Sequence, residues 1–238
     1  MILYAITDRC LAASRQGRSR EPDEQERRTA LVSLAREWTR GGVDYIQIRE
    51  KDLAGDDLLE LARAIVAAVD DEWMRSGEAG ARGARTKVLV NGLAGIALAA
   101  GADGVHLPGV AWARDVAAAR ESFARAGREC VVSVACHSVE EAALVDAASL
   151  IVFAPVFEKP LGDGEALPGR GLGALAAVCG AARAPVIALG GVNAANARDC
   201  VAAGAAGVAA IRMFLGEDWR GLRVQRTAPS AQRRGVDL

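Results

Sequence analysis

The chain has 238 residues, and 29 Lys and Arg residues balance 30 Asp and Glu residues to give a formal net charge of −1. That balance gives no electrostatic reason to expect nucleic acid or an anionic membrane as a partner, so any cationic site must be local. The five cysteines contain no C-x-x-C pair, no apolar run reaches membrane length and no signal-peptide pattern opens the chain, which together predict a cytoplasmic protein without disulfides or a zinc site.

Short apolar runs, each followed by an Ala-rich pattern of helical period, recur along the chain. The runs cover residues 2–8, 45–51, 86–92, 104–108, 130–136, 150–156, 185–191 and 207–214. Eight strands alternating with helices predict an α/β protein with a parallel sheet, and eight such units in under 240 residues favour a single-domain (β/α)₈ TIM barrel. A doubly wound open sheet remains the alternative, because the number of strands cannot prove closure.

Three segments fall outside this repeat. The barrel is expected to cover residues 1–215, and residues 216–238 are expected to form a polar C-terminal tail. Residues 14–28 are highly charged and residues 75–86 form a Gly-, Arg- and Ala-rich insertion. None of the three carries a pattern that points to chemistry.

The segment YIQIREK at residues 45–51 is the most informative stretch. Side chains of a strand alternate between faces, so Gln47, Arg49 and Lys51 would share one face and the two isoleucines the other. An amide beside two cations suits an anionic small molecule, because guanidinium and ammonium groups form charge-assisted hydrogen bonds with phosphate and carboxylate. The alternative is an edge strand with a solvated polar face.

The last two predicted strands suggest a phosphate site. Functional groups of a TIM barrel gather at the C-terminal ends of the strands, and phosphate often lies between the seventh and eighth loops. The seventh strand ends in Gly190-Gly191 before a predicted helix, so backbone N–H groups and a helix N-terminus could face an anion there. The eighth ends in Ile211-Arg212. We predict phosphate binding by these four residues; a simple tight turn is the alternative for the glycines.

The chain has two histidines. His137 closes the fifth strand on the face that points into the barrel mouth, where an imidazole can exchange a proton near neutral pH. Its neighbour Cys136 would point to the opposite face, so a Cys–His dyad is not expected. A core or capping histidine is the alternative for His137, and a structural role is expected for His106.

Metal binding has little support in the sequence. A hard cation such as Mg²⁺ needs carboxylates near the substrate phosphates. The third strand ends in Asn91-Gly92 and the fourth is followed by Pro108-Gly109-Val110, and neither place carries an acid. Asp8 alone makes a poor site, so no metal and no other cofactor is predicted.

The loop at residues 157–171 is long, rich in Gly and Pro, and charged. At a barrel mouth such a loop is typical of a lid or a substrate-contacting segment, which makes Lys159 and Arg170 candidate substrate-binding residues. A solvated linker is the alternative.

Taken together, these motifs resemble the thiamine phosphate synthase / thiazole tautomerase superfamily of TIM barrels. The similarity covers nearly the whole chain outside the insertions and the tail. It runs through YAITD (4–8), YIQIREKD (45–52), VLVNGLAGIALAAGADGVHLP (88–108), SVACHSVEEA (133–142) and VIALGGVNAANARDCVAAGAAGVAAI (186–211). The resemblance implies that Gln47, Arg49, Lys51 and Asn91 contact substrate in either branch.

The two branches differ after the third, fourth and sixth strands. The synthase pattern has Asn-Asp and Gly-Gln-(Glu/Asp)-Asp, whose acids hold Mg²⁺, and a Thr-x-Thr-Lys loop. This chain resembles the tautomerase branch at those points and also after the fifth strand, with Asn91-Gly92, Leu107-Pro108, His137-Ser138 and Gly169-Arg170-Gly171. It departs from that branch at Ala135-Cys136 and at Arg212, where the family usually has a small polar residue.

The resemblance therefore implies a cofactor-free isomerase of thiamine biosynthesis that aromatises a carboxythiazole phosphate, with His137 as the base. Two alternatives stay open. One is a thiamine phosphate synthase that joins hydroxymethylpyrimidine diphosphate to thiazole phosphate with Mg²⁺. The other is a non-catalytic barrel that binds a phosphate ligand. Barrels of this superfamily often self-associate, so a homo-oligomer is also implied.

Overall fold

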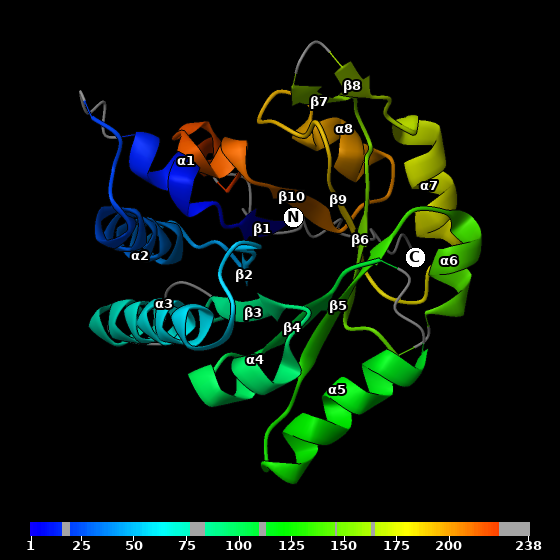
Figure 1. The fold of residues 1–238 in the computed structure, drawn as a ribbon. Helices are drawn as coiled ribbons and strands as arrows, with labels where there is room; N and C mark the ends of the chain where they lie inside the picture. The colour runs from blue at the N-terminus through cyan, green and yellow to red at the C-terminus, as the bar shows by residue number, and fades with distance from the viewer. Residues whose placement is uncertain (16–19, 77–83, 110–112, 146, 163–164, 224–238) are drawn as a thin grey trace, which may run out of the picture.

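A computed structural model describes residues 1–15, 20–76, 84–109, 113–145, 147–162 and 165–223 of the chain. Eight parallel strands close into a barrel in the order β1-β10-β9-β6-β5-β4-β3-β2, with helices around the outside (Figure 1). The last strand pairs with the first, with Ile2 opposite Gly207, so the sheet has no open edge. The predicted (β/α)₈ barrel is confirmed and the open sheet is excluded.

Each predicted strand is present, one to four residues shorter than the apolar run that indicated it. The barrel strands are β1 (Ile2–Ile6), β2 (Tyr45–Ile48), β3 (Lys87–Asn91), β4 (Gly104–Leu107), β5 (Val131–Cys136), β6 (Leu150–Phe153), β9 (Val186–Ala188) and β10 (Gly207–Ala210). The α-helices are α1 (Arg9–Ser14), α2 (Glu24–Arg40), α3 (Gly55–Arg75), α4 (Ala94–Ala100), α5 (Ala113–Arg125), α6 (Val139–Leu144), α7 (Gly171–Ala181) and α8 (Ala197–Ala202). Two 3₁₀ helices follow, η1 (Arg212–Leu215) and η2 (Asp218–Leu222).

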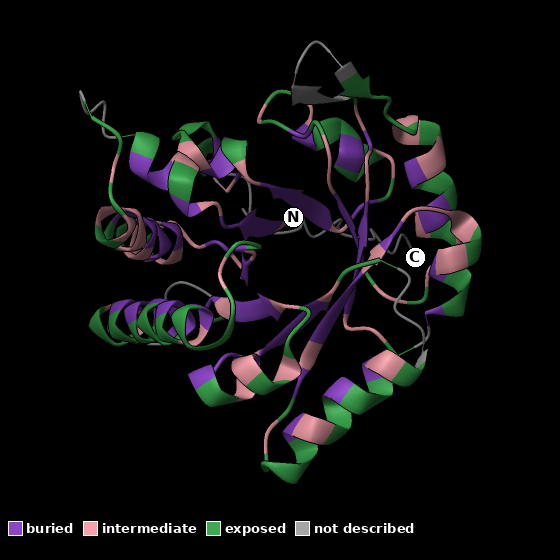
Figure 2. Ribbon diagram, in the orientation of Figure 1, coloured by how far each residue is buried: buried purple, intermediate pink, exposed green. Residues whose placement is uncertain are grey.

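Two apolar layers hold the barrel together. The outer layer lies between the strands and the inner faces of the helices, which Figure 2 shows as buried, with exposed residues on the outer faces. The inner layer fills the barrel with the side chains Tyr4, Ile6, Leu89, Leu150, Val152, Ile187 and Ala209. Because alternate residues of a strand enter opposite layers, the outer packing of Ile46 and Ile48 turns Gln47 into the barrel.

The chain still packs against the barrel beyond residue 215, the boundary expected from the sequence. Trp219 in η2 is 1% exposed, contacts Phe214 with ring centroids 5.5 Å apart and covers Gly41, where a Cβ would overlap the indole. Arg223 then forms an ion pair with Asp44 at 2.7 Å. A large aromatic side chain thus extends the packed domain into the predicted tail, and residues 224–238 lie outside the described residues.

The loop at residues 157–171 contains a hairpin that the sequence pattern did not indicate. Strands β7 (Lys159–Gly162) and β8 (Glu165–Leu167) pair antiparallel beside the barrel, at the end of β6 (Figure 1). Within the described part of the chain, no helix combines the length and the apolar character needed to cross a bilayer.

Candidate active site at the mouth of the barrel

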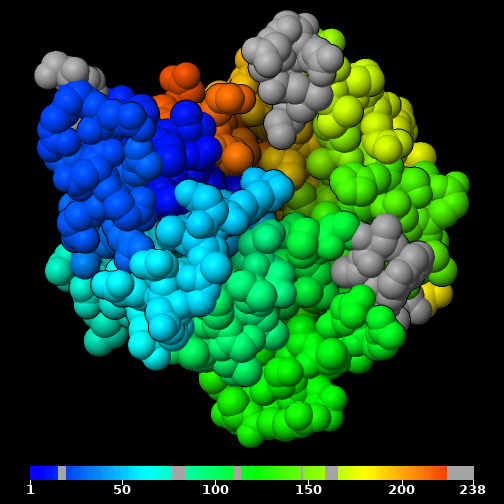
Figure 3. All heavy atoms as spheres, in the orientation of Figure 1, coloured from blue at the N-terminus to red at the C-terminus, as the bar shows by residue number. Residues whose placement is uncertain are grey.

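Strand β2 delivers an amide and two cations to the mouth. Gln47 is 1% exposed, and its Nε2 donates to Asn91 Oδ1 at 3.0 Å, whereas its Oε1 is buried and has no partner among the described residues. Alternation puts Arg49, which is half-buried, on the same face as Gln47, and Lys51 is exposed in the turn that follows. This turn faces the viewer in Figure 3. The structure thus brings Gln47, Arg49 and Asn91 to one region, and their substrate contacts remain predictions.

A row of polar side chains crosses the barrel from Asn91, which is half-buried, to His106 and Ser133, which are buried. Asn91, His106 and Ser133 are neighbours in register on β3, β4 and β5. Ser133 Oγ is 2.7 Å from His106 Nδ1 and 3.0 Å from the Tyr4 hydroxyl. Burial, with the nearby charge of Arg49, lowers the pKa of His106 from 6.5 to about 4. His106 is therefore a neutral structural group, in line with its expected role.

His137 follows β5 with its ring held in one orientation. Its Nδ1 lies 2.8 Å from the carbonyl oxygen of Ala154. A carbonyl can only accept, so Nδ1 carries the proton and Nε2 is left with a free lone pair. The backbone N–H of His137 donates to Glu141 Oε2 at 2.6 Å, and Ser138 caps α6 by accepting from the N–H of Glu141. The imidazole is thus fixed in the tautomer that a general base requires.

Cys136 has no part in this arrangement. It is fully buried in the outer layer, its Sγ lies 3.1 Å from the carbonyl oxygen of Ser138, and burial raises the pKa of its thiol. The absence of a Cys–His dyad follows from the alternation of side chains along β5.

Gly190 and Gly191 have a structural reason to be glycine that is independent of any ligand. Both have positive φ, 95° and 65°. A Cβ at Gly190 would lie 2.7 Å from Pro155 Cα, and one at Gly191 would lie 2.6 Å from the carbonyl oxygen of Glu158. The loop after β6 therefore packs directly against this turn, and phosphate binding by the two glycines remains a prediction.

The neighbouring groups give the phosphate prediction mixed support. Ile211 packs half-buried against the inner layer, whereas Arg212 begins η1 and is exposed. Asn193 Oδ1 accepts from the N–H groups of Ala195 and Asn196 at 2.9 and 3.2 Å, so these two donors already have an acceptor. Helix α8 begins only at Ala197, so the two glycines do not lie directly at its N-terminus.

The segment between β6 and α7 carries the remaining predicted contacts. Arg170 lies after the hairpin, directly precedes α7 and is exposed, and its backbone N–H donates to the carbonyl oxygen of Pro155 at 2.9 Å. Lys159 begins β7, and its side chain lies outside the described residues. The structure thus places both residues in the segment after β6, and contact with substrate remains a prediction for each.

The described residues at the mouth of the barrel do not provide a suitable set of ligands for a divalent metal ion. In the described ranges, no three His, Cys, Asp or Glu side chains are grouped to hold a metal ion. The turns directly after β3 (residues 92–93) and β4 (residues 108–114) contain no acid, and Asp8 caps α1 by accepting from the N–H of Leu11 at 3.0 Å. The residues present therefore do not fit Mg²⁺.

One buried polar cluster that lies behind the mouth was not predicted from the sequence. Thr7, Arg9 and Glu50 form a buried network in which Thr7 Oγ1 donates to Glu50 Oε1 at 2.6 Å. The position of Glu50 in the sequence could have predicted this network. Glu50 lies between the two cations that follow β2, on the face that points away from the mouth. A carboxylate on that face needs a buried partner.

The chain is similar in sequence and in fold to known proteins. The sequence profile of a family described as "Thiamine monophosphate synthase" matches residues 21–214. A putative thiamine-phosphate synthase of Geobacter sulfurreducens is 38% identical over 90% of this chain and 87% of its own length. The thiamine-phosphate synthase of Methanoculleus marisnigri is 36% identical over 90% and 88%. The solved structure of a thiamine phosphate pyrophosphorylase from Pyrococcus furiosus covers 92% of this chain and 90% of its own, with 26% identity and a TM-score of 0.66.

Proposed function

Because the chain belongs to the thiamine monophosphate synthase family, we propose that it is an enzyme of thiamine biosynthesis that acts on a thiazole phosphate at the mouth of its barrel. The cationic side chains of Arg49 and Lys51 at this mouth support an anionic substrate. The names of the relatives support the pathway. Two reactions of the family remain to be distinguished.

The side chains best support isomerisation, the cofactor-free aromatisation of a carboxythiazole phosphate. The observation that carries this proposal is the bond from His137 Nδ1 to the Ala154 carbonyl, because it leaves Nε2 free to act as a base. In the proposed reaction, Nε2 removes the proton from the ring carbon that bears the carboxylate. The same proton returns at the exocyclic carbon, so the ring becomes aromatic with no change in composition.

The remaining residues of the site would bind the substrate and stabilise charge in this reaction. Arg49 and Lys51 would hold the carboxylate and stabilise the negative charge that develops when the proton leaves. The unpartnered Oε1 of Gln47 suits an N–H or O–H donor of a ligand, because a buried acceptor without a donor is costly. Asn91 holds Gln47 in place for that contact.

The edge of the site would supply the phosphate contacts. Gly190, Gly191, Ile211 and Arg212 are the proposed phosphate ligands, and these residues lie in the loops after β9 and β10, where barrels often hold phosphate. Lys159 in the hairpin after β6 and Arg170 just before α7 would reach the substrate from this side.

The second candidate is thiamine phosphate synthase, and the names of the relatives favour it over the isomerase. This reaction joins a pyrimidine diphosphate to the thiazole phosphate and releases pyrophosphate, and the family implies Mg²⁺ for it. The segments after β3 and β4 offer Gly92, Pro108 and Gly109 where acids would be needed, so this chain's residues do not fit the metal. The names of the relatives favour the synthase, whereas the residues after β3 and β4 do not provide ligands for Mg²⁺. A direct assay is therefore needed to distinguish the two reactions.

Two assays on the purified chain distinguish the reactions. One follows the isomerisation of carboxythiazole phosphate by NMR. The other supplies hydroxymethylpyrimidine diphosphate, thiazole phosphate and Mg²⁺ and measures thiamine phosphate and pyrophosphate. We expect isomerisation by the wild type and a loss of about 10²-fold or more in His137→Asn. Thiamine phosphate formation without isomerisation would establish the synthase instead.

A further inference from the structure

The turn that carries the cations of the mouth is held from behind by Thr7. Thr7 follows β1 and is 1% exposed. Its Oγ1 accepts from the backbone N–H of Arg49 at 2.9 Å and donates to Glu50 Oε1 at 2.6 Å. Its own N–H donates to the carbonyl oxygen of Gln47 at 2.9 Å. One small side chain therefore fixes two consecutive residues of the turn, one through the backbone and one through the carboxylate.

Arg9 completes the same support. Its backbone N–H and Nη1 both donate to Glu50 Oε2, at 3.2 and 3.1 Å, and its Nη1 and Nη2 reach the two oxygens of Asp52 at 2.7 Å each. Lys51 lies between these two anchored acids. The guanidinium of Arg9 holds the pKa of Asp52 down at about 2, so the pair stays ionised at neutral pH.

The cations on the two sides of the turn have contrasting surroundings. Arg9 is 4% exposed and pairs with Glu50, Asp52 and Glu24. Arg49 and Lys51, by contrast, have no carboxylate partner among the described residues. Acids that could have neutralised the cations of the mouth are thus retained by Arg9 on the rear face, which leaves the front face positive for an anionic ligand.

We propose that Thr7 is the positioning residue of this anion site: through its hydroxyl it sets the place of Arg49 and, with Arg9 and Glu50, the place of Lys51. The proposal rests on the function proposed above, in which these two cations hold the substrate's carboxylate. Fixing the backbone that carries these cations before binding lowers the cost of ordering the turn when the anion arrives. Loss of the hydroxyl should therefore weaken anion binding while leaving the base at His137 in place.

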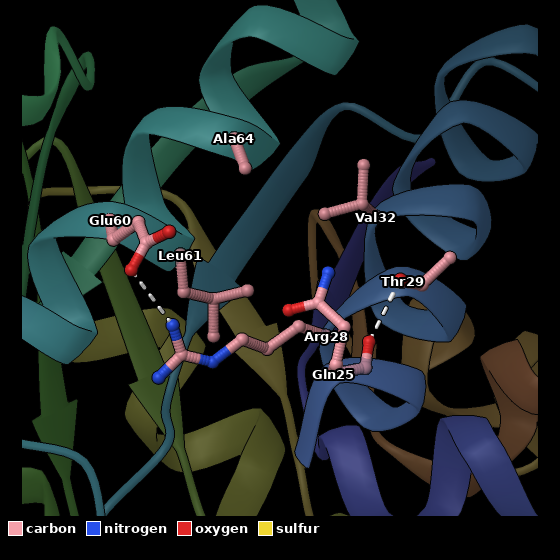
Figure 4. Close-up of a pocket in the computed structure, with 7 residues that line it drawn as sticks. All are labelled: Gln25, Arg28, Thr29, Val32, Glu60, Leu61 and Ala64. Carbon is pink, nitrogen blue, oxygen red and sulfur yellow. Dashed lines mark hydrogen bonds and ion pairs between the residues drawn. The ribbon is translucent and has the colours of Figure 1, made fainter. Parts of the chain in front are cut away.

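The chain offers a matched control in the same ion-pair network. Glu24 links Arg9 to Arg28, and Arg28 reaches across from α2 to Glu60 in a groove of about 210 Å³ between α2 and α3 (Figure 4). Arg28 also pairs with Asp57 at 2.7 Å and touches neither Thr7 nor Glu50. Arg28→Gln thus disturbs the outer helices and spares the turn.

The test compares Thr7→Val, which keeps the shape and removes the hydroxyl, with Thr7→Ser, which keeps the hydroxyl. Calorimetric titrations with carboxythiazole phosphate and with inorganic pyrophosphate measure anion affinity, and steady-state kinetics separate KM from kcat. We expect about a 10-fold loss of affinity and a matching rise in KM for Thr7→Val, with kcat within about threefold of the wild type. Thr7→Ser and Arg28→Gln should stay within about twofold.

Each outcome decides a different point. Equal affinities for wild type and Thr7→Val would overturn the positioning role, as would an equal loss in Arg28→Gln. If the wild type binds pyrophosphate but not carboxythiazole phosphate and Thr7→Val weakens that binding, the positioning role stands and the proposed substrate falls. If the wild type binds neither anion, both proposals fall. Should Thr7→Val not fold, Glu50→Gln replaces it, with the same expected loss.

Discussion

The stability of the protein should depend on pH through His106. Its pKa is about 4 in the folded barrel and near 6.5 in the unfolded chain. As pH falls below 6.5 the unfolded chain binds the proton first, so the free energy of unfolding falls until both states are protonated below pH 4. The free energy of unfolding is therefore free of this loss above pH 6.5, where His106 is neutral in both states. At about 1.4 kcal/mol per pKa unit the contribution of His106 amounts to roughly 3 kcal/mol in all, of which about 2.5 kcal/mol is lost by pH 4.5.

Urea unfolding of the wild type and of His106→Asn at pH 7.5 and pH 4.5, followed by tryptophan fluorescence, measures this contribution. All carboxylates are common to the two proteins, so their titration cancels in the difference. We expect the wild type to lose about 2–3 kcal/mol more than the variant between the two pH values. Equal losses in the two proteins would refute the assignment of a buried, neutral imidazole at this position.

Three substitutions and one control test the packing of the barrel. Ser133→Ala leaves two buried polar groups without a partner at about 1–3 kcal/mol each, so urea unfolding should show a loss of roughly 2–6 kcal/mol; a loss under 0.5 kcal/mol would contradict the buried network. Gly190→Ala should cost more than about 1 kcal/mol, whereas Gly173→Ala on the exposed face of α7, where a Cβ meets nothing within 4 Å, should be neutral or stabilising; equal effects would refute the close approach. Trp219→Ala should cost about 3–5 kcal/mol, measured the same way, and an unchanged midpoint would show that η2 does not belong to the packed domain.

The strands could be predicted because their signal is local. Each apolar run predicts one strand, and the alternation in residues 45–48 also predicts that Gln47 faces inward and the two isoleucines outward, as observed. Closure of the barrel followed from counting the units rather than from any single residue. The pairing of β1 with β10 that proves closure involves residues too far apart for any local pattern to report.

Contacts between distant loops could not be predicted. The role of Gly190 in admitting the loop at Pro155 depends on two loops that meet only in the folded protein. The burial of Trp219 depends in the same way on Gly41, where the absence of a side chain makes room for the indole. The hairpin after β6 was missed because Gly and Pro within residues 159–167 mask the strand pattern.

The closed order of the barrel also determines when the protein can begin to fold during synthesis. The first strand, Ile2–Ile6, needs β10 as its second neighbour, and the two lie roughly 200 residues apart in sequence. At ribosomal rates of about 5–20 residues per second, one edge of β1 therefore stays unpaired for ~10–40 s while the rest of the chain emerges. An unpaired, apolar strand edge is a template for association with other chains. The first strand of the nascent protein thus keeps one exposed edge until β10 has been synthesised.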